Sequence, residues 1–64
     1  MSTPSGAALS VISEHVDRYR HEVADMVASY RGGDHDEVLA ALYEAERLLR
    51  SAARAVRTAS VKAG

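Results

Sequence analysis

The sequence predicts an all-α protein: an antiparallel two-helix hairpin that dimerises into a four-helix bundle. Three observations predict it: two stretches of apolar residues at helical spacing, a Gly-Gly turn between them, and an apolar face on the second stretch that is wider than one helix can cover. The expected organisation is a flexible lead at 1–6 and a helical hairpin at 7–62, with helices at 7–31 and 35–60 and a turn at 32–34.

The first helix is expected because its apolar residues recur at alternating steps of three and four. They are Leu9, Ile12, Val16, Tyr19, Val23, Met26 and Tyr30. A strand would need alternation with a period of two, which the segment does not show. The start of this helix is open, because Thr3, Ser5 and Ser10 could each cap it.

Gly32-Gly33 is expected to end the first helix, since glycine adopts the left-handed conformation that closes a helix without steric cost. Asp34 is the expected N-cap of the second helix. Glu37 follows it at the spacing of a capping box. Asp36 and Glu37 also suit the positive end of the second helix dipole.

The second helix repeats the same spacing with smaller residues. Its row is Val38, Leu42, Ala45, Leu49, Ala52, Val56 and Ala59. Leu39, Ala41, Leu48 and Ala55 lie beside that row and widen the apolar face. The extra width indicates a further helix packed on this face.

The short turn makes the two helices antiparallel. The expected register brings large residues together and places Ile12 opposite two alanines. The pairs are Leu9 with Val56, Val16 with Leu49, Val23 with Leu42, Met26 with Val38, and Ile12 with Ala52-Ala53.

A chain of 64 residues forms one domain at most. Such a chain buries only about 60% of the surface that it exposes when unfolded. With no cysteine, neither a disulfide nor a thiolate metal site can supplement the core. A second copy or a helical partner protein is therefore expected to complete it, and the expected function is that of a small adaptor or regulator acting through helix packing.

The charges are unevenly spread although the net charge is −1. All nine acidic residues lie within 14–46, and no acid follows Arg47. Four arginines form one stripe on the second helix: Arg47, Arg50, Arg54 and Arg57. Nucleic acid or an acidic partner is the alternative function that this stripe suggests. Pairing with Glu44 and Glu46 and the helix dipole explain the same stripe without a ligand.

No enzymatic site, cofactor, metal or small-molecule substrate is expected. Asp17, His21 and Asp25 share one helix face at a spacing that could hold a metal, but no second histidine joins them, and a solvated stripe is the simpler interpretation. The serines lack a neighbouring base, and Gly32-Gly33 lacks the lysine of a phosphate-binding loop. The tyrosines are interpreted as packing residues: Tyr19, Tyr30 and Tyr43.

No apolar run approaches the roughly 20 residues of a bilayer span, so no membrane association is expected. The N-terminus also lacks the basic start and apolar stretch of a signal peptide. A cytoplasmic location is expected; secretion independent of a signal peptide is the alternative that the family resemblance described next implies.

The turn resembles that of the WXG100 (ESAT-6-like) family. Tyr30-Arg31-Gly32 is similar to its Trp-x-Gly signature, with Tyr in place of Trp, and Val38, Leu42, Leu49 and Val56 match its second-helix spacing. The resemblance covers residues 9–60. It implies an antiparallel hairpin that dimerises into a four-helix bundle and is exported by type VII secretion. The family's Tyr-x-x-x-Asp/Glu export signal is missing after the second helix; those letters occur only at the turn, from Tyr30 to Asp34.

Overall fold

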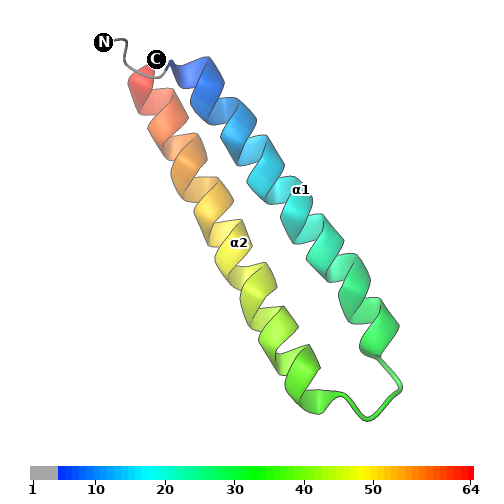
Figure 1. Ribbon diagram of the computed structural model, residues 1–64. Coiled ribbons are helices and arrows are strands. Elements are labelled where there is room, and N and C mark those ends of the chain that lie inside the picture. Colours follow the sequence, from blue (N-terminus) through cyan, green and yellow to red (C-terminus); the bar gives the residue numbers. More distant parts are fainter. Residues whose placement is uncertain (1–4) are drawn as a thin grey trace.

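The computed structural model describes residues 5–64 as a hairpin of two long helices, α1 (Gly6–Tyr30) and α2 (Asp36–Ala63). The helices run antiparallel and lie side by side along their whole length (Figure 1). The molecule is a narrow rod with extents of 51 × 18 × 13 Å. The expected all-α hairpin is confirmed. Residues 1–4 of the expected lead, including the candidate cap Thr3, lie outside the described residues.

α1 begins at one of the three predicted caps. Ser5 is its N-cap, and the Oγ of Ser5 accepts a 3.1 Å hydrogen bond from the backbone N–H of Ala8. Gly6 is therefore the first helical residue and not part of the lead. The helix ends at Tyr30, one residue before the expected boundary, and Gly32 follows with φ of 82°. Gly32 thus supplies the left-handed residue that the turn was expected to need.

The predicted N-cap of α2 was wrong. The cap is His35, which makes no side-chain capping bond, while its carbonyl accepts a 2.9 Å bond from the N–H of Leu39. Because the helix begins at Asp36, Glu37 is its second residue and cannot form a capping box with Asp34. The His35 ring instead packs edge-on against Tyr30, with centroids 5.2 Å apart. The cap position is thus held by a contact across the turn.

α2 runs to Ala63, three residues beyond the expected end at 60. Val61, Lys62 and Ala63 contain no glycine or proline that would stop a helix. Gly64, with φ of 84°, closes it, and its N–H donates to the carbonyl of Val61 at 3.3 Å.

Two hydrogen bonds between the helices define their register. The Oγ of Ser13 donates to the carbonyl of Ala53 at 2.9 Å, and the Oγ of Ser60 donates to the carbonyl of Gly6 at 2.6 Å. The residue numbers of both pairs add to 66. A Cβ atom on Gly6 would lie 2.7 Å from the backbone carbonyl oxygen of Ser60, so glycine is required for this close approach. Small residues therefore let the two backbones come together at these levels.

The expected register is confirmed to within one residue, because the numbers of three expected pairs add to 65 and the observed numbers add to 66; the three pairs are Leu9 with Val56, Val16 with Leu49, and Val23 with Leu42. Their members are half-buried along the contact between the helices, which we call the seam. These six residues, with Tyr30 from α1, are Leu9, Val16, Val23, Tyr30, Leu42, Leu49 and Val56.

The prediction that the other half of the α1 row lies in the seam was wrong. Ile12, Tyr19 and Met26 are 48%, 53% and 56% exposed. The residue after each one takes its place in the seam: Ser13 and Val27 are each 2% exposed, and Arg20 is half-buried. Each replaced position differs by one residue, about 100° around the helix, and because Leu9, Val16 and Val23 stay in the row, the buried face as a whole is turned by about 50°.

α2 shows the same rotation. Val38 is 40% exposed, and Ala52 and Ala59 are also exposed. The seam instead contains the residue that comes directly after each of these in the sequence: Leu39, Ala53 and Ser60. Because both helices are turned in the same sense, apolar residues that the sequence assigns to the seam remain uncovered on both of them.

Replacing Val27 with Ala tests the observed seam. Val27 is 2% exposed, so losing two buried methyl groups should lower the free energy of unfolding by roughly 2 kcal/mol. Val11→Ala is the matched control, since Val11 is 48% exposed on the same helix and should change stability by less than about 0.5 kcal/mol. Denaturant unfolding followed by circular dichroism measures both, and equal effects would contradict the observed rotation of α1.

Candidate interaction surface

One broad side of the hairpin is polar. The Nη2 of Arg31 donates a 3.4 Å hydrogen bond to the hydroxyl of Tyr43, and Asp17, Arg50 and Arg57 line one shallow hollow between the helices. Each of these five residues directly follows a half-buried seam residue. These contacts show that the residues directly after a half-buried seam residue, on either helix, lie on one broad side of the hairpin, which we call the polar side.

The opposite side is apolar. On each helix, every second seam position is shifted by one residue relative to the prediction. The residues directly before these shifted positions project away from the polar side. Because the helices are antiparallel, they do so on the same side of the hairpin for both helices. On α1 they are Ile12, Tyr19 and Met26; on α2 they are Val38, Ala45, Ala52 and Ala59. Their helical neighbours three or four residues away extend the row on α2: Ala41, Leu48 and Ala55. We call these ten residues the apolar side.

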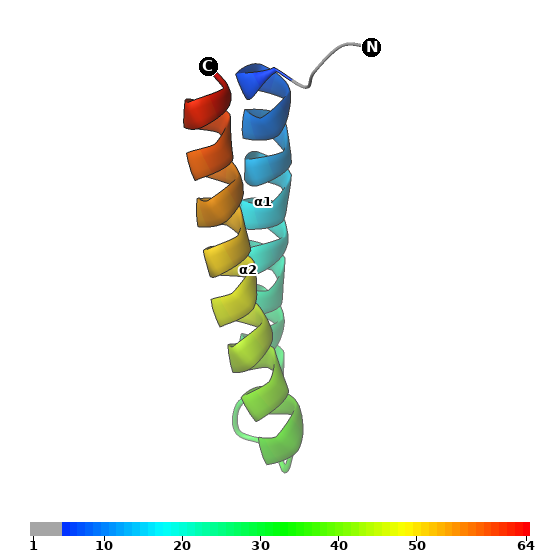
Figure 2. The same cartoon turned by 90° about the vertical axis from the view of Figure 1, so that its left-hand side faces the viewer.

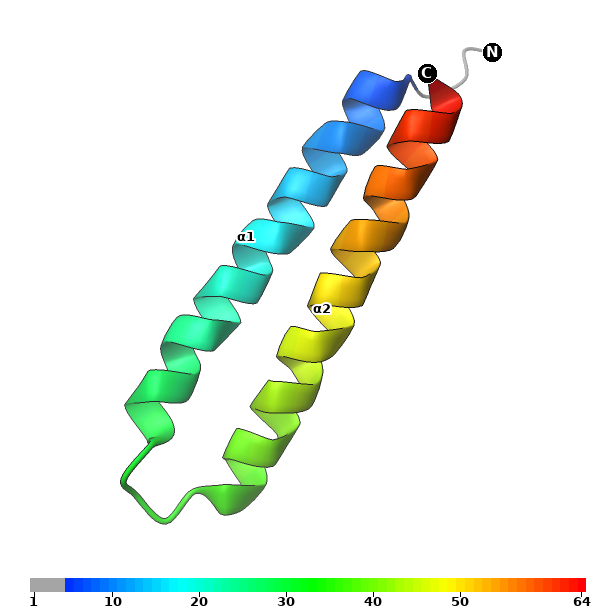
Figure 3. The same cartoon turned by 180° about the vertical axis from the view of Figure 1, so that it is seen from behind.

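The apolar side holds most of the large exposed apolar residues of the described chain. Ile12, Tyr19, Met26, Val38 and Leu48 are between 40% and 56% exposed. Val11, Tyr43 and Val61 are exposed elsewhere, singly. No other element of the described residues covers either broad side of the hairpin (Figures 2 and 3). An exposed apolar row of this kind is a candidate interaction surface.

Within residues 5–64, the arginine stripe consists of two arginines with carboxylate partners and two without. Arg47 donates to both carboxylate oxygens of Glu44, at 3.1 and 2.6 Å, and Arg50 lies 3.5 Å from Glu46. The hydrogen bond from Arg47 lowers the pKa of Glu44 below its ordinary value and raises that of Arg47. No carboxylate among the described residues lies within ion-pair distance of Arg54 or Arg57.

The Asp17 carboxylate lies close to the side chains of Arg20 and His21. The Nε of Arg20 donates a 2.9 Å bond to its Oδ1, and the Nε2 of His21 lies 3.4 Å from its Oδ2. The Arg20 hydrogen bond holds the pKa of Asp17 below its ordinary value, and the charges of Arg20, His21 and Arg57 act in the same direction. Across residues 5–64 no group of three or more potential ligand side chains is placed to hold a metal ion, Asp17, His21 and Asp25 included.

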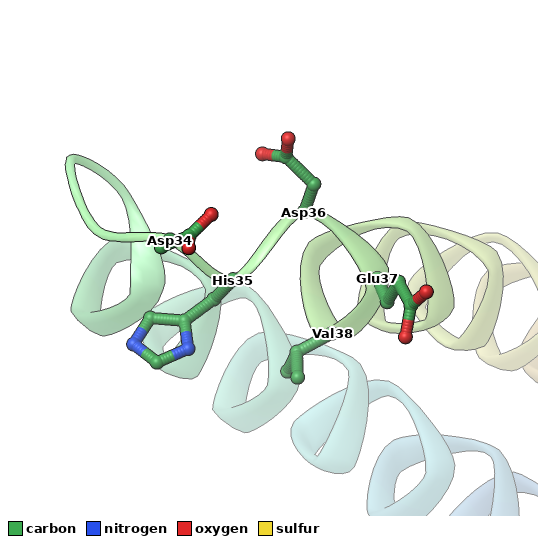
Figure 4. Close-up of a pocket in the computed structure, with 5 residues that line it drawn as sticks. All are labelled: Asp34, His35, Asp36, Glu37 and Val38. Carbon is green, nitrogen blue, oxygen red and sulfur yellow. The ribbon is translucent and has the colours of Figure 1, made fainter.

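The turn carries a second shallow hollow, lined by Asp34, His35, Asp36, Glu37 and Val38 (Figure 4). The Asp36 carboxylate and the His35 ring point to opposite sides of the chain, and the Glu37 carboxylate projects from the helix that follows. The carboxylates of Asp36 and Glu37 therefore lie apart, so the turn is an acidic tip rather than a built ligand site.

The sequence pattern identified the apolar residues correctly but did not distinguish which of them meet inside the hairpin. Ser13, Val27 and Ala53 were missed as the most buried positions. One signal could have found them: Gly6, Ser13, Ala53 and Ser60 place small residues at successive levels of the expected register. Small residues at matched levels indicate a close helix contact.

The described residues contain no helix of the length and apolarity needed to pass through a bilayer. The fold and its surfaces define a class: an all-α helical hairpin with one polar and one apolar broad side. Comparisons with protein-family models, with curated proteins and with solved structures give no match to the chain.

The environment of Asp17 predicts its titration. Its pKa should lie below the ordinary value of about 3.9, and Arg20→Gln should raise it because the principal hydrogen bond is lost. Since the folded-state pKa is the lower one, the contribution of Asp17 to stability is present above about pH 3.9 and is lost as the pH falls through the folded value. Carboxyl NMR titration measures both values; an Asp17 pKa that Arg20→Gln leaves unchanged would contradict the assigned cause.

Proposed function

We propose that the protein is a non-enzymatic interaction module that acts by packing helices on its apolar side, and that it dimerises into a four-helix bundle as a small adaptor or regulator. The observation that supports this proposal is the apolar side itself. Bulky side chains such as Tyr19, Met26 and Leu48 are about half exposed on one side of the hairpin. We expect another chain or a second copy to cover them.

The thickness of the molecule supports the same proposal. A hairpin with a smallest extent of 13 Å is a single layer of helices. Stable helical domains bury the apolar stripe of each helix within a packed interior, and two stacked layers are the usual solution. A second hairpin laid on the apolar side makes that second layer. The two hollows described within residues 5–64 are shallow and open to solvent, which favours binding over catalysis.

Substituting adjacent leucines should separate folding from association. Leu48→Arg places a charge on the apolar side, outside the seam, so it should convert a dimer to a monomer. Leu49→Arg places the same charge in the half-buried seam, so it should abolish the helical structure itself. Gel filtration with light scattering measures the mass, and circular dichroism measures the helix content over a concentration series.

Val61→Arg is the matched control, because Val61 is 76% exposed but lies off the apolar side. It should leave the mass and the helix content unchanged. A wild-type chain that is a stably folded monomer at every concentration would refute the proposal. So would a Leu48→Arg variant with the mass of the wild type.

Nucleic-acid binding is the second candidate function, and it is supported by the unpaired guanidinium groups of Arg54 and Arg57. Both lie along the hollow on the polar side, where an anionic backbone could lie. If this candidate holds, the protein should retard DNA or RNA at low salt, and Arg54→Gln with Arg57→Gln should weaken binding and flatten its salt dependence. Absence of retardation at low salt removes this candidate without affecting the first.

Kinship with the WXG100 family would place the same hairpin among exported bundles. Its support is the Tyr30-Arg31-Gly32 signature and the positive φ of Gly32 at the turn. This kinship would specify the compartment in which the module acts, whereas the packing argument holds in any compartment.

A further inference from the structure

We infer that the apolar side is covered by a second copy of this chain laid head to tail. The turn of each hairpin then lies over the open end of the other, which is the end opposite its turn. The inference rests on the proposed function and specifies the partner and its orientation. Two independent observations carry it: the charge polarity of the rod and the level at which the apolar rows are centred.

The first observation is that formal charge changes sign along the rod. The half nearest the turn, residues 20–46, contains seven acidic and two basic side chains, a charge of −5. The half nearest the open end, residues 5–19 and 47–64, contains two acidic and six basic side chains, a charge of +4. Because the helices are antiparallel, each half is one continuous end of the molecule (Figure 1).

This polarity favours one of the two symmetric ways of stacking the apolar sides. With the turns at the same end, a charge of −5 lies over −5 and a charge of +4 lies over +4. With the turns at opposite ends, each acidic half lies over a basic half. Packed helix axes are about 8–10 Å apart, close to the screening length of about 8 Å at physiological salt, so these charges still interact. Electrostatics therefore selects the head-to-tail arrangement.

The second observation is that both apolar rows are centred at one level. The α1 row is centred on Tyr19, and the rows on α2 are centred on Leu48 or within one residue of it. In the register set by the two inter-helix hydrogen bonds, where residue numbers add to 66, Tyr19 lies level with Arg47, one residue from Leu48. A two-fold axis through this level, perpendicular to the rod, maps each row onto itself.

That axis gives every apolar residue an apolar partner. Tyr19 meets the partner's Tyr19, and Leu48 meets the partner's Leu48. The remaining pairs are Ile12 with the partner's Met26, Val38 with the partner's Ala59, Ala41 with the partner's Ala55, and Ala45 with the partner's Ala52. The sign of the charge also changes near this level, between residues 46 and 47 on α2. A single axis therefore aligns both the apolar rows and the opposite charges.

The same-end arrangement has one steric merit, because it would set the bulky row of α1 against the alanines of α2. Shape alone therefore does not select an orientation, and the charge distribution decides. The two arrangements differ in a measurable way: salt should weaken the head-to-tail dimer and strengthen the same-end dimer.

Because the chain contains no cysteine, Asp34→Cys provides a single label site at the turn. A nitroxide there lies about 15 residues of helix from the proposed axis, so two labels in one dimer should be about 45 Å apart. Pulsed electron paramagnetic resonance on the full chain measures this distance. An equal mixture with a Val61→Cys label should add a second distance of roughly 20–25 Å, because Val61 of one copy lies near the level of the partner's turn.

The distances separate the failure of this inference from the failure of the proposed function. Turn labels less than about 25 Å apart, in a dimer that tightens as NaCl is added, would overturn the head-to-tail orientation and leave the interaction module intact. A monomeric mass with no dipolar coupling would overturn both. A distance near 45 Å, with a dissociation constant that rises several-fold as NaCl is added, supports the inference.

Discussion

The close contact between small residues in the seam is the constraint on which the rest of the structure depends. Ser13 and Ala53 are buried against each other, and their hydrogen bond joins a side chain of one helix to the backbone of the other. Gly6 and Ser60 make the equivalent contact toward the open end. Such contacts hold both the distance and the rotation of the helices. Once the rotation is given, the residues left on each broad side follow from the sequence.

That rotation explains how far the sequence could predict the fold. The helices, the turn at Gly32 and the register were predictable, because they depend on apolar spacing and on glycine. The choice between Ile12 and Ser13 as the seam residue was not, because Leu9 and Val16 are compatible with either step. A pattern of apolar residues shows which faces avoid water, but it does not show which neighbour covers each face. The N-cap was missed for a related reason: the His35–Tyr30 contact arises only after the turn has closed.

The two candidate surfaces differ in how far sequence alone could define them. The arginine stripe was visible as spacing, but its division was not, because the pairing of Arg47 with Glu44 and of Arg50 with Glu46 depends on side-chain geometry. The apolar side was visible only as an excess of width on the second helix. Its continuation onto the first helix, through Tyr19 and Met26, required the observed rotation. The surface that supports the proposed function is therefore a property of the hairpin and not of either helix.

The half-buried residues shared by the predicted and observed rows are compatible with both the hairpin and the proposed four-helix bundle. Val16 and Leu49 lie at the corner between the seam and the apolar side, so one flank of each contacts the other helix and the other flank remains exposed. In a four-helix bundle, residues at such corners face the common core of all four helices. If the seam used Ile12 and Met26 instead, these apolar side chains would be buried inside the hairpin, and Ser13 and Arg20 would lie toward the polar side. The observed rotation places Ser13 where Ala53 can accept its hydrogen bond and Arg20 beside Asp17. It thereby satisfies these polar groups within the hairpin and leaves the apolar ones for a partner.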